Sequence, residues 1–177
     1  YPMREEIGRR LSLPVALEND GIAAAIGEWK FGAGRGRDNL VYVTVSTGIG
    51  GGVIADGRVL RGRRGMAGHV GHMSFMQDGE LCVCGGRGCF EAYGSGSALA
   101  QRARAAAQDD PSSSLNGSGQ ISSEDVFAAA AKGDRLAQAL VQQEAEILGR
   151  GLAALLHLYS PEVLGTGGGL SSQFETL

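Results

Sequence analysis

The feature that most constrains this chain is a short segment that holds all three of its cysteines. It runs from Gly68 to Glu91 and reads GHVGHMSFMQDGELCVCGGRGCFE. One histidine and the three cysteines form the array H-x9-C-x-C-x4-C, which consists of His72, Cys82, Cys84 and Cys89. One imidazole and three thiolates are a ligand set of closed, tetrahedral zinc sites. The array therefore predicts a zinc-stabilised loop. It does not predict metal catalysis, because four protein ligands leave no open position for water.

Two other interpretations of these cysteines are open. They can be ordinary reduced thiols, although all three fall within a few positions of a glycine-rich turn beside a histidine. A disulfide framework fits less well, because the number of cysteines is odd and a C-x-C pair bridges poorly. Thiols that are kept for a metal are typical of a reducing compartment, so we expect a cytoplasmic protein.

Composition and charge exclude several classes of protein. The chain has 177 residues, of which 43% are hydrophobic and 20% are charged, enough for the core of one domain or of parts of two. Its formal net charge of -3 does not favour nucleic acid as the main partner. No apolar run reaches membrane-spanning length, so we expect no membrane partner. The chain opens without an initiator Met and closes on what looks like the start of another helix, which predicts a fragment.

Helical and strand patterns alternate along the chain. Apolar residues at Ile22, Ile26 and Trp29 predict one face of a helix that Asn19 or Asp20 caps. Further helices are expected at 3–10, 97–108, from 122 onward and at 134–159, and strands are expected at 15–17, 40–46 and from 53 onward. The sequence Asp56-Gly57 predicts a two-residue hairpin turn. The order of these elements indicates an α/β or mixed-sheet domain.

Two glycine-rich turns are expected to follow strands, at 47–52 and 165–169. Glycine lets backbone N–H groups approach phosphate oxygens closely, and the N-terminus of a following helix adds a favourable dipole. Neither turn carries the G-K-[ST] sequence of a Walker A loop, and each alone is also consistent with an ordinary hairpin turn. The presence of two such turns favours a phosphate ligand.

Asp20 is a candidate catalytic base. It would lie after the predicted strand 15–17 and at the start of a helix, where α/β proteins place their ligands. The helix dipole would keep its carboxylate ionised, so that it could accept a hydroxyl proton during phosphoryl transfer. The alternative is a plain helix cap. The basic segment 61–65 and His157 are interpreted as a solvated loop and an ordinary helix residue.

Four segments, taken in order, resemble the ROK family: LENDGIAAAIGEW, VTVSTGIGGGVI, GMAGHVGHM and CVCGGRGCFEAYGSG. That family comprises ATP-dependent sugar kinases, related transcriptional repressors and open reading frames. The resemblance covers the chain from about Pro14 to its end. It implies an α/β, two-lobed, actin-like (ribonuclease H-like) ATPase fold. Residues 1–177 would form the end of the N-terminal lobe and most of the C-terminal lobe.

The resemblance also implies a role for each motif residue. Asp20 would be the base on the sugar 6-hydroxyl, and Asn19 would hydrogen-bond a neighbouring hydroxyl. His72 would touch the sugar near C1 besides binding structural Zn²⁺, and Glu91 would accept from hydroxyls around C1 and C2. The residues implied to bind ATP, which enters with Mg²⁺, are Thr47, Gly48, Gly50, Gly51 and Gly52 at the phosphates and Gly167 and Gly168 near the adenosine.

His69 is the position that separates subgroups of the family. Glucokinase-like members read G-E-[IV]-G-H, whereas this chain reads G-H-V-G-H and so resembles the N-acetylmannosamine kinases, which read G-H-I-G-H. A neutral imidazole can donate a hydrogen bond to an acetamido carbonyl at C2, and a carboxylate can only accept. The same replacement could instead retune a glucose site. The resemblance therefore implies phosphorylation of the 6-hydroxyl of a hexose or N-acylhexosamine, with N-acetylmannosamine as the expected substrate and a homodimer or higher homo-oligomer as the expected assembly.

The chain also departs from the family pattern. The D-x-G-G-T phosphate loop and much of the first lobe are absent, so we expect residues 1–177 alone to be inactive. The segment before Gly167 is also weaker as a strand than in the family. Three alternatives remain, namely a glucokinase, a sugar-responsive repressor with an upstream helix-turn-helix that binds DNA, and a non-catalytic sugar-binding zinc domain.

Overall fold

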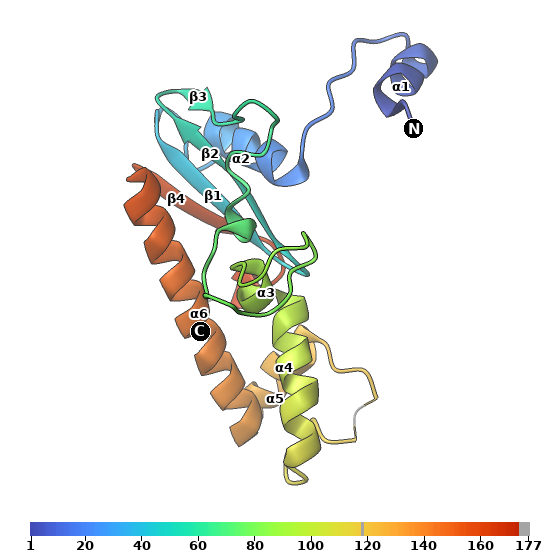
Figure 1. Ribbon diagram of the computed structural model, residues 1–177, viewed down its shortest axis with the longest axis vertical. Helices are drawn as coiled ribbons and strands as arrows, with labels where there is room; N and C mark the ends of the chain where they lie inside the picture. Colours follow the sequence, from blue (N-terminus) through green and yellow to red (C-terminus); the bar gives the residue numbers. More distant parts are fainter. Residues whose placement is uncertain (118, 174–177) are drawn as a thin grey trace.

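The computed structural model in Figure 1 describes residues 1–117 and 119–173. The helices are α1 (Met3–Leu11), α2 (Asp20–Phe31), α3 (Glu91–Gly94), α4 (Gly96–Asp109), α5 (Ser123–Ala131) and α6 (Arg135–Tyr159), with short 3₁₀ turns η1 (Val70–His72) and η2 (Ser171–Gln173). The strands are β1 (Leu40–Val45), β2 (Ile49–Ala55), β3 (Arg58–Val59) and β4 (Val163–Gly167).

The four strands form one mixed sheet in the order β3-β2-β1-β4. β1 pairs antiparallel with β2 and parallel with β4. Alternate residues of a strand point to opposite faces of the sheet, and both faces are covered by helices. Leu40 packs with Ala25 of α2 on one face, while Val41 and Val43 join a larger core that includes Leu155 of α6 on the other.

The helices α3, α4 and α5 form a second group beyond one end of the sheet (Figure 1). α4 and α5 lie beside α6, which runs from this group back along the sheet. In contrast, α1 buries no residue and is joined to α2 by an extended segment. None of the helices in the described ranges is both long and apolar enough to cross a membrane.

Three helices begin at residues whose side chains cap them, and one of these caps, at Asn19, is predicted from the sequence. Asn19 caps α2, and its side chain accepts a hydrogen bond from the backbone of Ile22. Ser122 and Asp125 form a complete capping box at the start of α5. Asp134 caps α6, and its side chain accepts a hydrogen bond from the backbone N–H of Ala137. Capping depends on contacts within one helical turn, so local sequence suffices to predict it.

One strand prediction and two turn predictions are corrected by the structure. The predicted strand at 15–17 is wrong: these residues have no regular structure, because no strand lies beside them in the described part of the chain. The glycine turn predicted at 47–52 is shorter, because β2 already begins at Ile49 and its glycines pair with β1. Similarly, the turn predicted at 165–169 starts later, because β4 extends to Gly167.

The two-residue hairpin is confirmed. Asp56 and Gly57 join β2 to β3, and both residues have positive φ angles of 50° and 67°. Where a further helix is expected to start at the end of the chain, the structure has a 3₁₀ turn at Ser171–Gln173, and positions 174–177 lie outside the described residues.

Candidate active site

A cavity of about 540 Å³ opens where β1 and β4 end and β2 begins. The carboxyl ends of parallel strands are the usual place for ligands in α/β proteins. The cavity brings together residues from five separate parts of the chain. Its lining includes these residues predicted from the sequence: Asn19, Asp20, Thr47, Gly48, Gly50, Gly51, His69, His72, Glu91 and Gly168.

Two glycines predicted to contact ATP do not line this cavity. Gly52 lies under α2, where an added Cβ atom would come within 2.7 Å of the Ala25 Cβ atom. Gly167 lies against the ring of Tyr42, so that any side chain there would overlap the phenol. Both glycines allow close packing of neighbouring elements, which a sequence pattern cannot distinguish from close approach to a ligand.

Sequence reasoning missed two hydroxyl residues of the cavity. Thr44 and Ser46 lie two positions apart at the end of β1, and both line the cavity. Residues at this spacing share one face of a strand. The signal that could have found them is the polar alternation of an otherwise apolar strand as it reaches the glycine turn.

Asp20 is placed by the close contact of α2 with β2. It is the first residue of α2 and is exposed, with its Oδ1 atom 2.8 Å from the backbone nitrogen of Gly21, which donates to it. Gly21 lies directly against the backbone of Gly51, where a Cβ atom would overlap. This contact sets the Asp20 carboxylate at the edge of the glycine strand, in position to meet a ligand in the cavity.

Glu91 forms the opposite wall. It is the first residue of α3, and its Oε2 atom accepts a hydrogen bond from the backbone N–H of Ile49 at 2.9 Å. Its Oε1 atom lies 3.9 Å from the Cys82 sulfur. The same carboxylate is therefore held by the first residue of β2 and touches the cysteine-rich segment.

The four predicted metal ligands lie together in space. Their ligand atoms are all within 4.8 Å of one another. The Nδ1 atom of His72 is 3.6 Å from the Cys82 sulfur, and the sulfurs of Cys84 and Cys89 are also 3.6 Å apart. With Zn–S bonds of about 2.3 Å, a tetrahedral site places neighbouring ligands about 3.8 Å apart. The donor set and its spacing therefore fit one Zn²⁺ ion.

Without a bound metal, the pKa values of the Cys84 and Cys89 thiols are shifted in opposite directions. A hydrogen bond from the backbone of Gly86 is the main cause that lowers the pKa of Cys84 below its usual value. Burial, followed by the neighbouring thiols, raises the pKa of Cys89 to about 12. All three cysteines are unbridged, and a sulfur separation of 3.6 Å is far from the roughly 2.05 Å of a disulfide. A bound cation would compensate the repulsion among three thiolates.

His69 lines the cavity close to the candidate metal ligand His72. It immediately precedes η1, and its ring centroid is 6.4 Å from that of His72. The Nε2 atom of His69 is buried and has no hydrogen-bond partner among the residues that the structure describes. A buried nitrogen without a hydrogen-bond partner costs free energy. A ligand in the cavity that hydrogen-bonds this imidazole would remove that cost.

A second cavity of about 380 Å³ adjoins the first through Ser46 and Thr47. It lies at the N-termini of α4 and α5, and Gly169 and Leu170 close its other side. The N-terminus of a helix carries unpaired N–H groups and a positive dipole end, which favour anions. Gly169 belongs to the glycine turn predicted at 165–169, but the two glycines predicted near the adenosine, Gly167 and Gly168, do not line this cavity. The helix ends on its other side were not predicted to meet a ligand.

Comparison with known proteins gives consistent likenesses. The model of the ROK family matches residues 1–177. The chain is 39% identical to a glucokinase of Streptomyces coelicolor, over 97% of the chain and 56% of that protein. It is 42% identical to an N-acetylmannosamine kinase of Citrobacter koseri, over 86% of the chain and 49% of that protein. The chain thus spans about half the length of the curated relatives it matches.

Solved structures show the same likeness. A ROK family glucokinase from Streptomyces griseus, in complex with glucose and AMPPNP, superposes with a TM-score of 0.86 at 38% identity, over 97% of this chain and 57% of that one. A ROK family transcriptional regulator, a homologue of the E. coli MLC protein, superposes with a TM-score of 0.82 at 36% identity, over 98% of this chain and 44% of that one. The backbone alone therefore does not distinguish a kinase from a regulator.

Proposed function

Because the chain belongs to the ROK family and has the actin-like ATPase fold of ROK sugar kinases, we propose that it forms the sugar site and one side of the ATP site of an ATP-dependent sugar kinase. One observation carries this proposal. A single cavity joins the Asp20 carboxylate, the glycine edge of β2 and the Glu91 carboxylate. An acceptor base, a phosphate cradle and a hydroxyl-binding group are the parts that phosphoryl transfer to a sugar requires.

In the proposed reaction, Asp20 accepts the proton of the sugar 6-hydroxyl as its oxygen attacks the γ-phosphorus of ATP. The bond from the γ-phosphorus to the bridging oxygen breaks, and ADP leaves with those electrons. Asn19, beside the base, hydrogen-bonds a neighbouring hydroxyl, while Glu91 and His72 orient the ring from the other wall. The Mg²⁺ that enters with ATP would supply charge neutralisation at the phosphates.

The nucleotide would extend from the first cavity into the second. Gly48, Gly50 and Gly51 line the first cavity beside Asp20, where the phosphates would lie. Thr47 lines both cavities, and Gly169 lies in the second. The N-terminus of α4, a helix of 14 residues, adds its dipole at that junction.

A Zn²⁺ ion held by His72, Cys82, Cys84 and Cys89 would stabilise the loop and take no part in the chemistry, because four protein ligands close its coordination shell. Its role follows from the connections of the site. The loop touches Glu91 through Cys82, and His72 itself lines the sugar cavity. Zinc would thus make one wall of the sugar site rigid.

Within this function, N-acetylmannosamine is the preferred sugar that we propose. Support comes from His69, whose imidazole can donate to an acetamido carbonyl and which has a buried nitrogen that lacks a partner in the described structure. A glucokinase of the same family is the alternative, and the chain has curated relatives of both kinds at similar identity.

A sugar-responsive repressor is the second candidate, favoured by the likeness to the ROK transcriptional regulator. The two candidates differ in what accompanies the chain: a D-x-G-G-T phosphate loop would complete a kinase, and a helix-turn-helix would complete a repressor. Since the chain spans about half of its curated relatives, we propose that residues 1–177 are part of a larger kinase and are inactive alone. The predicted homodimer or higher homo-oligomer stays a prediction.

The experiment that tests the function is sugar profiling of the complete protein with Mg·ATP. ADP release is measured with N-acetylmannosamine, N-acetylglucosamine, glucose and no sugar. We expect sugar-dependent ADP release with N-acetylmannosamine above glucose. The opposite order would select the glucokinase alternative. No sugar-dependent release, together with sugar-sensitive DNA binding, would select the repressor.

A further inference from the structure

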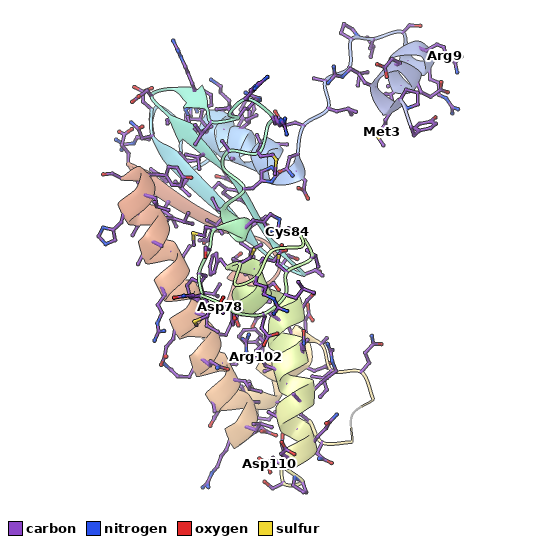
Figure 2. All side chains as sticks on the ribbon, in the orientation of Figure 1. Met3, Arg9, Asp78, Cys84, Arg102 and Asp110 are labelled. Atoms are coloured by element: carbon purple, nitrogen blue, oxygen red, sulfur yellow. The ribbon has the colours of Figure 1, made fainter. Side chains whose placement is uncertain are left out.

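A partly buried ion pair joins α4 to α6, outside the residues used above. Glu144 of α6 is completely buried, with 0% of its surface exposed, and its Oε2 atom accepts a hydrogen bond from Arg102 of α4. Figure 2 shows Arg102 on α4, on the side that faces α6. Burial raises the pKa of Glu144 to about 7, and the charge of Arg102 works against that rise.

The pair continues to the segment that carries Glu91. Arg102 also donates, through its other terminal nitrogen, to the backbone carbonyl of Tyr93 in α3. The Tyr93 hydroxyl in turn accepts from the backbone N–H of Glu80, which lies in the cysteine-rich loop. A chain of polar contacts therefore runs from α6 through α4 to α3 and the loop, and it reaches α3 two residues after Glu91.

A second contact, between Phe90 and Gly151, packs the start of α3 against the same face of α6. The ring of Phe90 lies against Gly151, where any side chain would overlap it. Glu144 and Gly151 are seven positions apart, which places them on one side of the helix, two turns from each other. The helix α3 is therefore held at its start by the packing of Phe90 against Gly151, and near its end by the hydrogen bond from Arg102 to the Tyr93 carbonyl.

A contribution to stability alone does not explain the Arg102–Glu144 ion pair, because its burial costs free energy. A buried ion pair can often be replaced by apolar side chains without loss of stability, because the removal of two charges from water is expensive. Here the pair is also incompletely satisfied, since Arg102 Nε and Glu144 Oε1 have no hydrogen-bond partner among the described residues. An arginine has, however, two donor arms in a fixed fork, which apolar packing cannot imitate.

We propose that Arg102 and Glu144 are positioning residues, which hold α3 by the Tyr93 carbonyl so that Glu91 keeps its place in the wall of the sugar cavity. The proposal rests on the proposed function, in which Glu91 binds sugar hydroxyls. Neither residue of the pair lines the cavity at the N-termini of α4 and α5. Arg102 lines a third cavity, which it shares with Glu91, Thr47 and Gly48, whereas Glu144 is completely buried.

The test compares Glu144→Gln with Glu146→Gln in the complete protein. Glu146 lies on the same helix two residues further on and is exposed, so it is the matched control. Steady-state kinetics are measured well below the melting temperature of each variant, with sugar and ATP varied separately. Because small displacements of substrate-binding groups cost large factors, we expect the KM for sugar to rise about tenfold in Glu144→Gln. The KM for ATP should change less than twofold, and the control should match the wild type.

Arg102→Lys separates positioning from stability. Lysine keeps the charge opposite Glu144 but lacks the fork that reaches Tyr93 at the same time. We expect a melting temperature near that of the wild type and a KM for sugar that is raised as in Glu144→Gln. Variants that melt earlier but keep the wild-type KM for sugar would show a purely structural pair and overturn the positioning role. A wild-type protein that phosphorylates no sugar would instead overturn the proposed function, and this inference with it.

Discussion

The carboxylate of Glu91 joins two parts of the chain that are far apart in sequence: its Oε2 atom accepts a hydrogen bond from the Ile49 backbone at 2.9 Å, and its Oε1 atom lies 3.9 Å from the Cys82 sulfur. The glycine strand β2 and the cysteine-rich loop therefore share one acidic side chain. A change in the four proposed metal ligands should therefore also change the cavity that we propose as the sugar site.

Loss of a metal ligand is the first prediction. Metal analysis of the complete wild-type protein should find about one zinc per chain, since the four ligand atoms fit a tetrahedral site. Cys89→Ser should lose that zinc and raise the KM for sugar, because Cys89 lies two residues before Glu91. His157→Ala, an exposed site on α6, is the control and should retain zinc. A folded wild-type protein that contains no zinc would refute the structural metal site.

Removal of the proposed base is the second prediction. Asp20→Asn should lower kcat by a factor of about 10² to 10⁴, because an amide cannot accept the hydroxyl proton. Sugar binding, measured by calorimetry, should persist, since asparagine can still hydrogen-bond. Asp56→Asn makes the same chemical change in the β2–β3 turn and should leave kcat unchanged. Near-normal turnover in Asp20→Asn would rule out this residue as the base.

A change of sugar preference is the third prediction. His69→Glu replaces a group that can donate by one that only accepts, so it should weaken use of an N-acyl sugar relative to glucose. We expect the ratio of kcat/KM for N-acetylmannosamine over that for glucose to fall by about 10- to 100-fold. His157→Glu is the control on the surface of α6. An unchanged ratio would show that another residue selects the sugar.

The fourth prediction concerns stability and pH at the start of α6. Burial works to raise the pKa of Asp134, but hydrogen bonds from Ala137, Ser114 and Ser113 outweigh it and lower the pKa to about 2. A lowered pKa means that the stabilisation is present above the unfolded value of 3.8 and is lost as the pH falls through about 2.

Asp134→Ala should therefore lower the free energy of unfolding by about 1 kcal/mol at neutral pH, the usual worth of an N-cap. The difference from the wild type should shrink as the pH falls from about 4 toward 2. Denaturant unfolding at several pH values measures both effects. Asp109→Ala, at the exposed end of α4, should not lower stability. A difference that persists undiminished at pH 2 would contradict the assigned cause.

The sequence predicted those parts of the protein that depend on neighbours along the chain. The cap at Asn19 and the hairpin at Asp56 are each complete within a few residues, so local sequence is enough to specify them. The same holds for the grouping of His72 with Cys82, Cys84 and Cys89, because three cysteines spaced closely within one loop can be arranged in few ways. Family motifs then indicated which residues would share the cavity.

Only the tertiary structure determined which distant segments pair as strands or pack against one another. Residues 15–17 are as apolar as a strand but have no neighbour to pair with in the described structure, while Gly50 and Gly51 form a strand because β1 lies beside them. Likewise, no local pattern shows that Gly52 and Gly167 face α2 and Tyr42, away from the cavity, or that Glu144 reaches Arg102. Local hydrogen bonds and turn preferences can be read from a sequence, whereas close approach depends on which surfaces the whole fold brings together.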